Sequence, residues 1–427
     1  MDRWRFFAAL GVAAATPAAC TAFPSPSPTA EAAPITAAAV RTHVMVLADD
    51  DLEGRGGGYP GEEKAAAYIA ERFRAAGLET FVQAFDFIPR APERLDQLLT
   101  SRNVLAVLPG ADPRLAGEVV LVGAHHDGQG RTGQADGGRL PLEDLAARAD
   151  TIWNSADDNA SSVAAVLEIA RALAGGAARP RRTIVFATFG TEEHALNGSA
   201  HLAQHPWPRG ARWGAVVNLE KLGRAPDQFL IMAGCSTSAE WLGVLGQANA
   251  AAGAAVECLL PELVADTDHY PFGALGVPAI VLGTAHEVDT HQPSDESGRL
   301  DYAALARRAG YARSFVELLA NRDTLPAFAA GTARGSGLLP VTASPAERER
   351  LGLGERGAFK ASDVLPGLPA AAAGLRPGDF VISLDGQPFT VETPERRIEE
   401  TLAERGAVTL AVRRGEKTLT MRLEGNR

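Results

Sequence analysis

The feature that most constrains the fold is an alternation of short apolar runs with helical segments, which extends from about residue 35 to residue 322. The apolar runs are typical of buried strands, and the segments between them repeat their apolar residues with the period of a helix. Examples are the runs at 117–124 and 182–189, with a helical segment at 160–173 between them. This alternation predicts an α/β domain with a mostly parallel central sheet and helices on both faces.

The same alternation predicts further elements. They are strands at 213–219, 228–233 and 278–283, and helices at 62–77, 238–251 and 302–319. Apolar residues make up 46% of the 427 residues, which is enough for cores of this size. Lys and Arg together number 41 against 52 for Asp and Glu, and the net charge of −11 argues against a nucleic-acid-binding protein.

The C-terminal part of the chain has a different pattern. We predict a linker at 323–343, because most of this stretch is rich in Ala, Gly, Thr and Pro, and a separate small α+β domain at 344–427. The elements predicted in it are strands at 380–384, 407–412 and 418–423 and a helix at 394–405.

The first 20 residues resemble a signal peptide. Two arginines precede an apolar run at 6–15, which is far shorter than the roughly 20 residues that a bilayer span needs. The tetrapeptide ending at Cys20 resembles a bacterial lipoprotein box, although Pro17 departs from its usual first residue. We therefore expect export, either as a periplasmic or cell-envelope lipoprotein lipidated at Cys20 or by plain secretion. A Ser/Pro/Ala-rich tether at 21–34 suits both outcomes.

The two remaining cysteines leave two interpretations open. Cys235 and Cys258 would be able to form a disulfide in an oxidising compartment. Alternatively, they are two small buried residues, because the sequence does not give their separation in space.

Polar residues gather where the predicted strands end. The clusters are HHD at 125–127, SADDN at 155–159, GTEEH at 190–194, NLE at 218–220 and DTHQP at 289–293. Each cluster alone has an ordinary explanation, such as a helix N-cap at Asp158 or Asn159. Together they are expected at one edge of the sheet, where parallel strands end and ligands bind.

The chemistry of these clusters favours a metal centre. Carboxylates and imidazoles without thiolates are a set that suits Zn, Mn or Co. The adjacent carboxylates of Glu192 and Glu193 repel each other unless a positive charge lies beside them. Two metal ions that share a carboxylate would neutralise these acids.

The motifs also resemble those of a known family. GAHHD, SADDNASS, GTEEHALNGS, VVNLEKLGR, DTDHYPFGALGVPAI and DTHQPSDE occur in the order found in the two-zinc metallopeptidase family of bacterial leucyl aminopeptidases. Relatives of this family include glutamate carboxypeptidases and glutaminyl cyclases. The resemblance covers residues 35–319 and implies a zinc exopeptidase fold with two Zn²⁺ ions, for which Mn or Co are possible substitutes.

The resemblance implies a role for each matching residue. The implied metal ligands are His125, Asp157, Glu193, Glu220 and His291. Asp157 would bridge the two ions and precede a cis peptide bond to Asp158, while Glu220 stands where most relatives have Asp. Asp127 would orient the imidazole of His125. Glu192 would be the general base, which takes a proton from the attacking water and returns it to the leaving amine.

Two further features bear on the substrate. The resemblance places Asp268 and His269 near the substrate, with His269 as a hydrogen-bonding group and not as a metal ligand. The segment 128–155 is longer than the minimal loop of the family. It is expected to form either a pocket wall with Trp153 as an aromatic contact or a surface elaboration.

The C-terminal domain resembles a bacterial PDZ domain through the string GLPAAAAGLRPGDFVISLDGQPF. PDZ domains commonly take up a C-terminal peptide as an added strand. The candidate carboxylate-binding loop consists of Leu351, Gly352, Leu353 and Gly354. The alternative interpretation is a structural appendage.

The function expected from these features is that of an exported two-zinc aminopeptidase acting on peptides with a free N-terminus. One alternative is a carboxypeptidase or other amidohydrolase on the same metal site. Glutaminyl cyclase chemistry is disfavoured, because it uses a single zinc and both ligand sets are present here. An alternative of another class is a PDZ-led peptide-binding protein with a vestigial peptidase domain. Neither nucleic acid nor a membrane is expected as a partner, apart from a lipid anchor.

Overall fold

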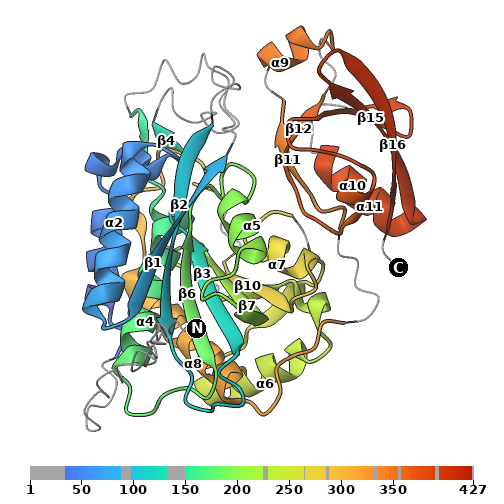
Figure 1. The fold of residues 1–427 in the computed structure, drawn as a ribbon. Helices are drawn as coiled ribbons and strands as arrows, with labels where there is room; N and C mark the ends of the chain where they lie inside the picture. Colours follow the sequence, from blue (N-terminus) through green and yellow to red (C-terminus); the bar gives the residue numbers. More distant parts are fainter. Residues whose placement is uncertain are drawn as a thin grey trace, which may run out of the picture.

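The chain forms a large and a small sheet, each packed against helices (Figure 1). This computed structural model describes residues 34–87, 98–131, 150–224, 229–263, 265–284, 288–329, 335–343, 345–353, 357–389 and 394–425. The predicted signal peptide and lipidated Cys20, and the tether up to residue 33, lie outside the described residues. Within the described part of the chain, no helix has both the length and the apolar character needed to cross a bilayer.

The large sheet has eight strands in the order β1-β2-β6-β3-β7-β10-β8-β9. Their bounds are β1 Glu79–Phe87, β2 Leu99–Leu108, β3 Glu118–His125, β6 Thr183–Phe189, β7 Arg212–Glu220, β8 Ile231–Ala233, β9 Glu257–Leu260 and β10 Ala279–Gly283. The four central strands β6, β3, β7 and β10 are parallel neighbours. Their C-terminal ends therefore lie at the same edge of the sheet.

Helices cover both faces of this sheet, because alternate residues of each strand point to opposite faces. In β3, Val120 and Val122 belong to one apolar core, and Val119 and Leu121 belong to the other. The first core is closed by α1 Ala37–Leu47, α2 Pro60–Ala75, α4 Ser162–Ala174, α6 Trp241–Ala252 and α8 Tyr302–Asn321. The second is closed by α5 Asn197–Gln204 and α7 Tyr270–Ala274. The predicted α/β architecture is confirmed.

Two smaller features complete this domain. Cys235 and Cys258 are joined by a disulfide bond, which decides between the two interpretations of these cysteines. A two-stranded sheet pairs β4 Gly130–Arg131 with β5 Ile152–Trp153, and Trp153 within it is buried. The residues between these strands, at 132–149, lie outside the described part of the chain.

The small sheet has the strand order β11-β12-β13-β15-β16, with β14 paired to β13. Its strands are β11 Leu338–Thr342, β12 Phe359–Val364, β13 Phe380–Leu384, β14 Gln387–Pro388, β15 Ala407–Arg414 and β16 Lys417–Glu424. Its helices are α9 Pro345–Arg350, α10 Pro369–Ala372 and α11 Pro394–Arg405. β11 lies within the predicted linker at 323–343, and this boundary was wrong. β11 pairs with β12, and its Leu338 lies in the apolar core of the small domain, so this domain begins no later than Leu338.

Candidate metal centre

Five side chains from separate segments meet at the C-terminal edge of the parallel strands. His125 ends β3 and Glu220 ends β7. Glu193 and His291 follow β6 and β10 in the sequence, and Asp158 lies in the turn that leads into α4. These residues form two groups of three, each with its ligand atoms within 4.8 Å of one another.

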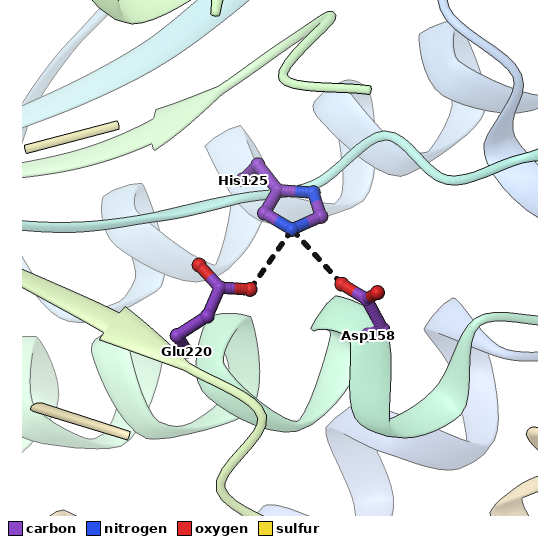
Figure 2. A group of neighbouring side chains, drawn as sticks. All are labelled: His125, Asp158 and Glu220. Carbon is purple, nitrogen blue, oxygen red and sulfur yellow. Dashed lines mark hydrogen bonds and ion pairs between the residues drawn. The ribbon is translucent and has the colours of Figure 1, made fainter. Parts of the chain in front are cut away.

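The first group consists of His125, Asp158 and Glu220, which point toward one another in Figure 2. Nε2 of His125 lies 3.2 Å from Oδ1 of Asp158 and 3.2 Å from Oε1 of Glu220. All three residues are buried. One imidazole nitrogen and two carboxylate oxygens thus face a common point.

The second group consists of Asp158, Glu193 and His291. Nε2 of His291 lies 3.3 Å from Oδ2 of Asp158 and 3.1 Å from Oε2 of Glu193. Asp158 therefore belongs to both groups and directs one carboxylate oxygen to each. This is the geometry of a bridging carboxylate between two sites.

The bridging position is occupied by Asp158, and the prediction that placed Asp157 there was wrong. Oδ1 of Asp157 instead accepts hydrogen bonds from the backbone N–H of Gly223, at 2.6 Å, and from Oγ of Ser161, at 3.0 Å. The cis peptide bond also lies one residue later than predicted, between Asp158 and Asn159. The two aspartates are adjacent and chemically identical, so only the path of the turn decides which carboxylate faces the histidines.

Two residues that the sequence analysis did not single out support this turn. The carboxylate of Asp295 accepts hydrogen bonds from the backbone N–H groups of Asp157 and Asp158, at 2.9 to 3.0 Å. The guanidinium of Arg55 is fully buried and donates to the carbonyl oxygens of His126 and Ser155, among others. The sequence offered a signal for each residue. Arg55 is a charged residue within a glycine-rich segment, and Asp295 belongs to the motif DTHQPSDE.

Asp127 links two parts of the centre. Its Oδ1 lies 3.6 Å from Nδ1 of His125, and its carbonyl oxygen lies 3.2 Å from the same nitrogen. Its carboxylate also accepts hydrogen bonds from the backbone N–H groups of Glu192, at 3.0 Å, and Glu193, at 3.3 Å. Asp127 therefore orients the turn after β6 as well as the imidazole.

The electrostatics of the two groups show a local excess of negative charge. Burial lowers the pKa of His125, but the carboxylates around it, first Glu220 and then Glu192, raise this pKa well above its usual value. Glu193 raises the pKa of His291 to about 11, against the effect of burial. Burial raises the pKa of Asp158, yet hydrogen bonds from the two histidines hold it well below its usual value.

These residues fit a divalent metal ion in each group. Without a metal, protonation of the two imidazoles offsets part of the negative charge of the carboxylates, which is why both histidine pKa values are high. A divalent cation would supply the same compensation and would leave both imidazoles neutral, as metal ligands must be. Oxygen and nitrogen donors without sulfur suit zinc, manganese or cobalt.

Glu192 and Asp268 lie beside the two groups. Burial raises the pKa of Glu192 well above its usual value and raises that of Asp268 to about 8, and each carboxyl group lies close enough to His125 for this histidine to oppose the shift. His269 is also buried, but Nδ1 of its ring pairs with Oγ1 of Thr267 at 2.7 Å, and the ring packs against Gly234. Among the described contacts, none joins His269 to the metal ligands.

The described residues of the predicted carboxylate-binding loop in the small domain use their backbone N–H groups within the protein. The backbone N–H groups of Leu351, Gly352 and Leu353 donate to carbonyl oxygens of α9, at 2.9 Å each. They form the C-terminal turn of that helix, and the side chain of Leu353 is buried. Gly354 lies outside the described residues. A Leu-Gly repeat also suits a helix end, and a carboxylate-binding role for this loop stays a prediction.

The chain is similar in sequence to a known enzyme. Leupeptin-inactivating enzyme 1 of Streptomyces exfoliatus is 26% identical over 230 residues, which are 53% of this chain but 44% of that protein. The match thus spans less than half of the length of this relative.

Two solved structures share the fold. The zinc aminopeptidase BSAP of Bacillus subtilis matches with a TM-score of 0.53 and 16% identity, over 66% of this chain and 95% of its own. A glutaminyl cyclase of Fimbriiglobus ruber matches with a TM-score of 0.55 and 17% identity, over 69% of this chain and 99% of its own.

Family models assign both domains. A PDZ domain model matches residues 360–414, as the sequence resemblance implied. The model of peptidase family M28 matches residues 103–316, which is half of the chain and includes all five side chains of the two groups. The chain therefore belongs to peptidase family M28.

Proposed function

We propose that this protein is a zinc aminopeptidase that holds two zinc ions and removes N-terminal residues from peptides. The observation that carries the proposal is the pair of carboxylate–imidazole groups that share Asp158, with Glu192 beside them. His125 and Glu220 would hold one ion, Glu193 and His291 the other, and Asp158 both. Membership of peptidase family M28 and the likeness to a zinc aminopeptidase support this assignment.

The protein side chains divide the remaining work. When bound, zinc supplies Lewis-acid chemistry, which polarises a carbonyl group and lowers the pKa of water. Glu192 would take a proton from the attacking water and pass it to the leaving amine. Burial raises the pKa of this carboxyl, which makes its carboxylate a stronger proton acceptor than an exposed one. Asp127 holds the backbone of Glu192 and so fixes the position of this carboxyl.

Asp268 is the candidate for recognition of the substrate amine. It is a fully buried carboxyl close enough to His125 and Glu220 to affect their electrostatics. An ammonium group beside it would lower its pKa and favour the charged form. This role would explain a preference for peptides with a free N-terminus.

A peptide-binding role for the PDZ domain is a second candidate, supported by the match to the PDZ family. In its strongest form, the PDZ domain alone carries the function and the peptidase domain is vestigial. The complete pair of ligand groups argues against a vestigial peptidase.

We further propose that the protein is exported, as residues 1–20 predict. The Cys235–Cys258 disulfide supports this, because such bonds persist in oxidising compartments. Lipidation of Cys20 would anchor the protein to the cell envelope.

The test of the main proposal compares a leucyl peptide with a free amine and its N-acetylated counterpart, using zinc-loaded protein. We expect cleavage of the free peptide only, and a loss of about 10²- to 10⁴-fold in kcat for Glu192→Gln with zinc content unchanged. Release of the C-terminal residue from the acetylated peptide would indicate a carboxypeptidase instead. Zinc-free, inactive protein that still binds peptide would favour the PDZ-led function.

A further inference from the structure

The PDZ domain is docked on the two elements that follow the catalytic segments. In Figure 1, α5 and α7 lie on the side of the large sheet that faces the small domain. α5 follows the turn that carries Glu192 and Glu193, and α7 follows Asp268 and His269. An apolar cluster joins the domains, formed by Leu196, Ala200, Tyr270 and Ala274 of the peptidase domain and Leu339, Leu365 and Leu368 of the PDZ domain.

Two hydrogen bonds cross the same interface. Oγ of Ser362, on β12, lies 3.0 Å from Oδ1 of Asn197 and donates to it. The backbone N–H of Gly337, next to β11, donates to the hydroxyl oxygen of Tyr270 at 3.3 Å. Ser362, Asn197 and Tyr270 are all buried, so water does not compete for these bonds.

Asn197 connects Ser362 to the catalytic turn, which is the segment 191–196 that carries Glu192 and Glu193. Its Nδ2 donates to the carbonyl oxygen of His194, and its backbone N–H donates to the carbonyl oxygen of Thr191 at 3.3 Å. Asn197 thus spans the turn from 191 to 196. Its side-chain oxygen is held by Ser362, which orients the amide so that its nitrogen faces His194.

This turn has a backbone that needs outside support. Thr191, Ala195 and Leu196 have φ angles of 59°, 76° and 59°, in the left-handed region that residues other than glycine rarely adopt. Such conformations persist when the surrounding structure holds them. The PDZ domain supplies part of that support through Ser362 and through the apolar cluster that covers Leu196.

We propose that the PDZ domain is part of the catalytic apparatus: Ser362 acts through Asn197 as a positioning residue that holds the turn carrying Glu192 and Glu193. The PDZ domain is then held rigidly against the peptidase domain and is not a module on a flexible tether. The expected effect on kcat rests on the proposed function. The contact between Ser362 and Asn197 does not depend on which reaction the protein catalyses.

The test uses the full chain with Ser362→Val and Ser362→Thr, two side chains of equal size that differ in the hydroxyl group. We expect Ser362→Val to lower kcat about tenfold with little change in KM, and Ser362→Thr to retain most of the activity. Hydrogen exchange of the backbone at 190–197 should be faster in Ser362→Val, whereas exchange in β16 should not change. Equal kcat and equal exchange in both variants would overturn the proposal.

A double-mutant cycle checks that Ser362 acts through Asn197. In an Asn197→Ala background, Ser362→Val should lower kcat no further, because the linking amide is already absent. An undiminished tenfold loss in that background would overturn the pathway through Asn197. If the unmodified protein cleaves no peptide, the proposed function fails, and the exchange comparison still decides whether Ser362 holds the turn.

Discussion

At the scale of single residues, the centre depends on which of two adjacent aspartates faces the histidines. Asp158 contacts both His125 and His291, and Asp157 hydrogen-bonds to Gly223 and Ser161 instead. The two carboxylates consequently have opposite pKa shifts. Burial raises the pKa of Asp157 to about 6, whereas the two histidines hold that of Asp158 well below its usual value.

Replacement of each aspartate by asparagine should separate these roles. Asp158→Asn removes the carboxylate shared by both groups and should weaken zinc binding by about 100-fold or more. Asp157→Asn should keep its zinc and lose about 1 kcal/mol of stability, through weaker hydrogen bonds to Gly223 and Ser161. Metal content after dialysis, with thermal unfolding as the control for folding, checks both outcomes. Loss of zinc from Asp157→Asn alone would contradict the assignment.

At the scale of elements, the first turn of α2 is joined to the sheet by one buried carboxyl. Glu62 accepts hydrogen bonds from the hydroxyl of Ser101, on β2, and from the backbone N–H of Gly58, at 2.6 Å. It also lies 3.9 Å from Nε2 of His126. Burial raises the pKa of Glu62 to about 8 and lowers that of His126 to about 3, so both groups favour their neutral forms.

This carboxyl should make stability depend on pH. The pKa of Glu62 is about 8 in the folded protein against an ordinary value of 4.5. Over this range the folded state retains a proton that the unfolded state releases, so the stability that Glu62 contributes falls as the pH rises from about 4.5 to about 8. At about 1.4 kcal/mol per pKa unit, the loss reaches about 5 kcal/mol as an upper bound.

Urea unfolding of Glu62→Gln at pH 5 and pH 8.5 measures this contribution. The variant should lose less stability between the two pH values than the unmodified protein, because glutamine has no proton to release. Glu63→Gln, an exposed position on the same turn, is the matched control and should keep the original pH dependence. Identical pH dependence in Glu62→Gln and the unmodified protein would argue against a neutral Glu62.

At the scale of the whole molecule, the two domains share an apolar interface. Leu339 and Leu365 of the PDZ domain are fully buried in the cluster that contains Leu196 and Tyr270 of the peptidase domain. A tethered domain would expose these side chains to water. The docked arrangement predicts that the two domains unfold together.

Calorimetry of Leu365→Ala tests this prediction. Removal of the buried side chain should cost about 2–5 kcal/mol and should split a single unfolding transition into two, because the lost contacts belong to the interface. Leu384→Ala, in the separate core of the PDZ domain, is the control. It should destabilise the PDZ domain itself and leave the interface intact. Two transitions in the unmodified protein would contradict cooperative docking.

The sequence by itself determined the α/β architecture and the edge of the sheet at which chemistry occurs. Strands such as β3 and β6 are buried on both faces, so they appear as continuous apolar runs. Polar residues that follow such apolar runs must therefore lie at the ends of the strands, as His125 and Glu193 do. These patterns are local in the sequence, so they can be recognised without knowledge of the tertiary contacts.

Only the tertiary structure decided the details that depend on distant contacts. The choice of Asp158 over Asp157 depends on a turn held by Asp295, which is 137 residues away in the chain. The start of the PDZ domain depends on the pairing of β11 with β12, and its link to the catalytic turn depends on Ser362 and Asn197. Neither Ser362 nor Asn197 stands in a sequence pattern that would indicate this contact. Such contacts are stabilised by burial and by hydrogen bonds between segments that are far apart in the chain. Only folding brings these segments together, so patterns of neighbouring residues do not reveal which of them will meet.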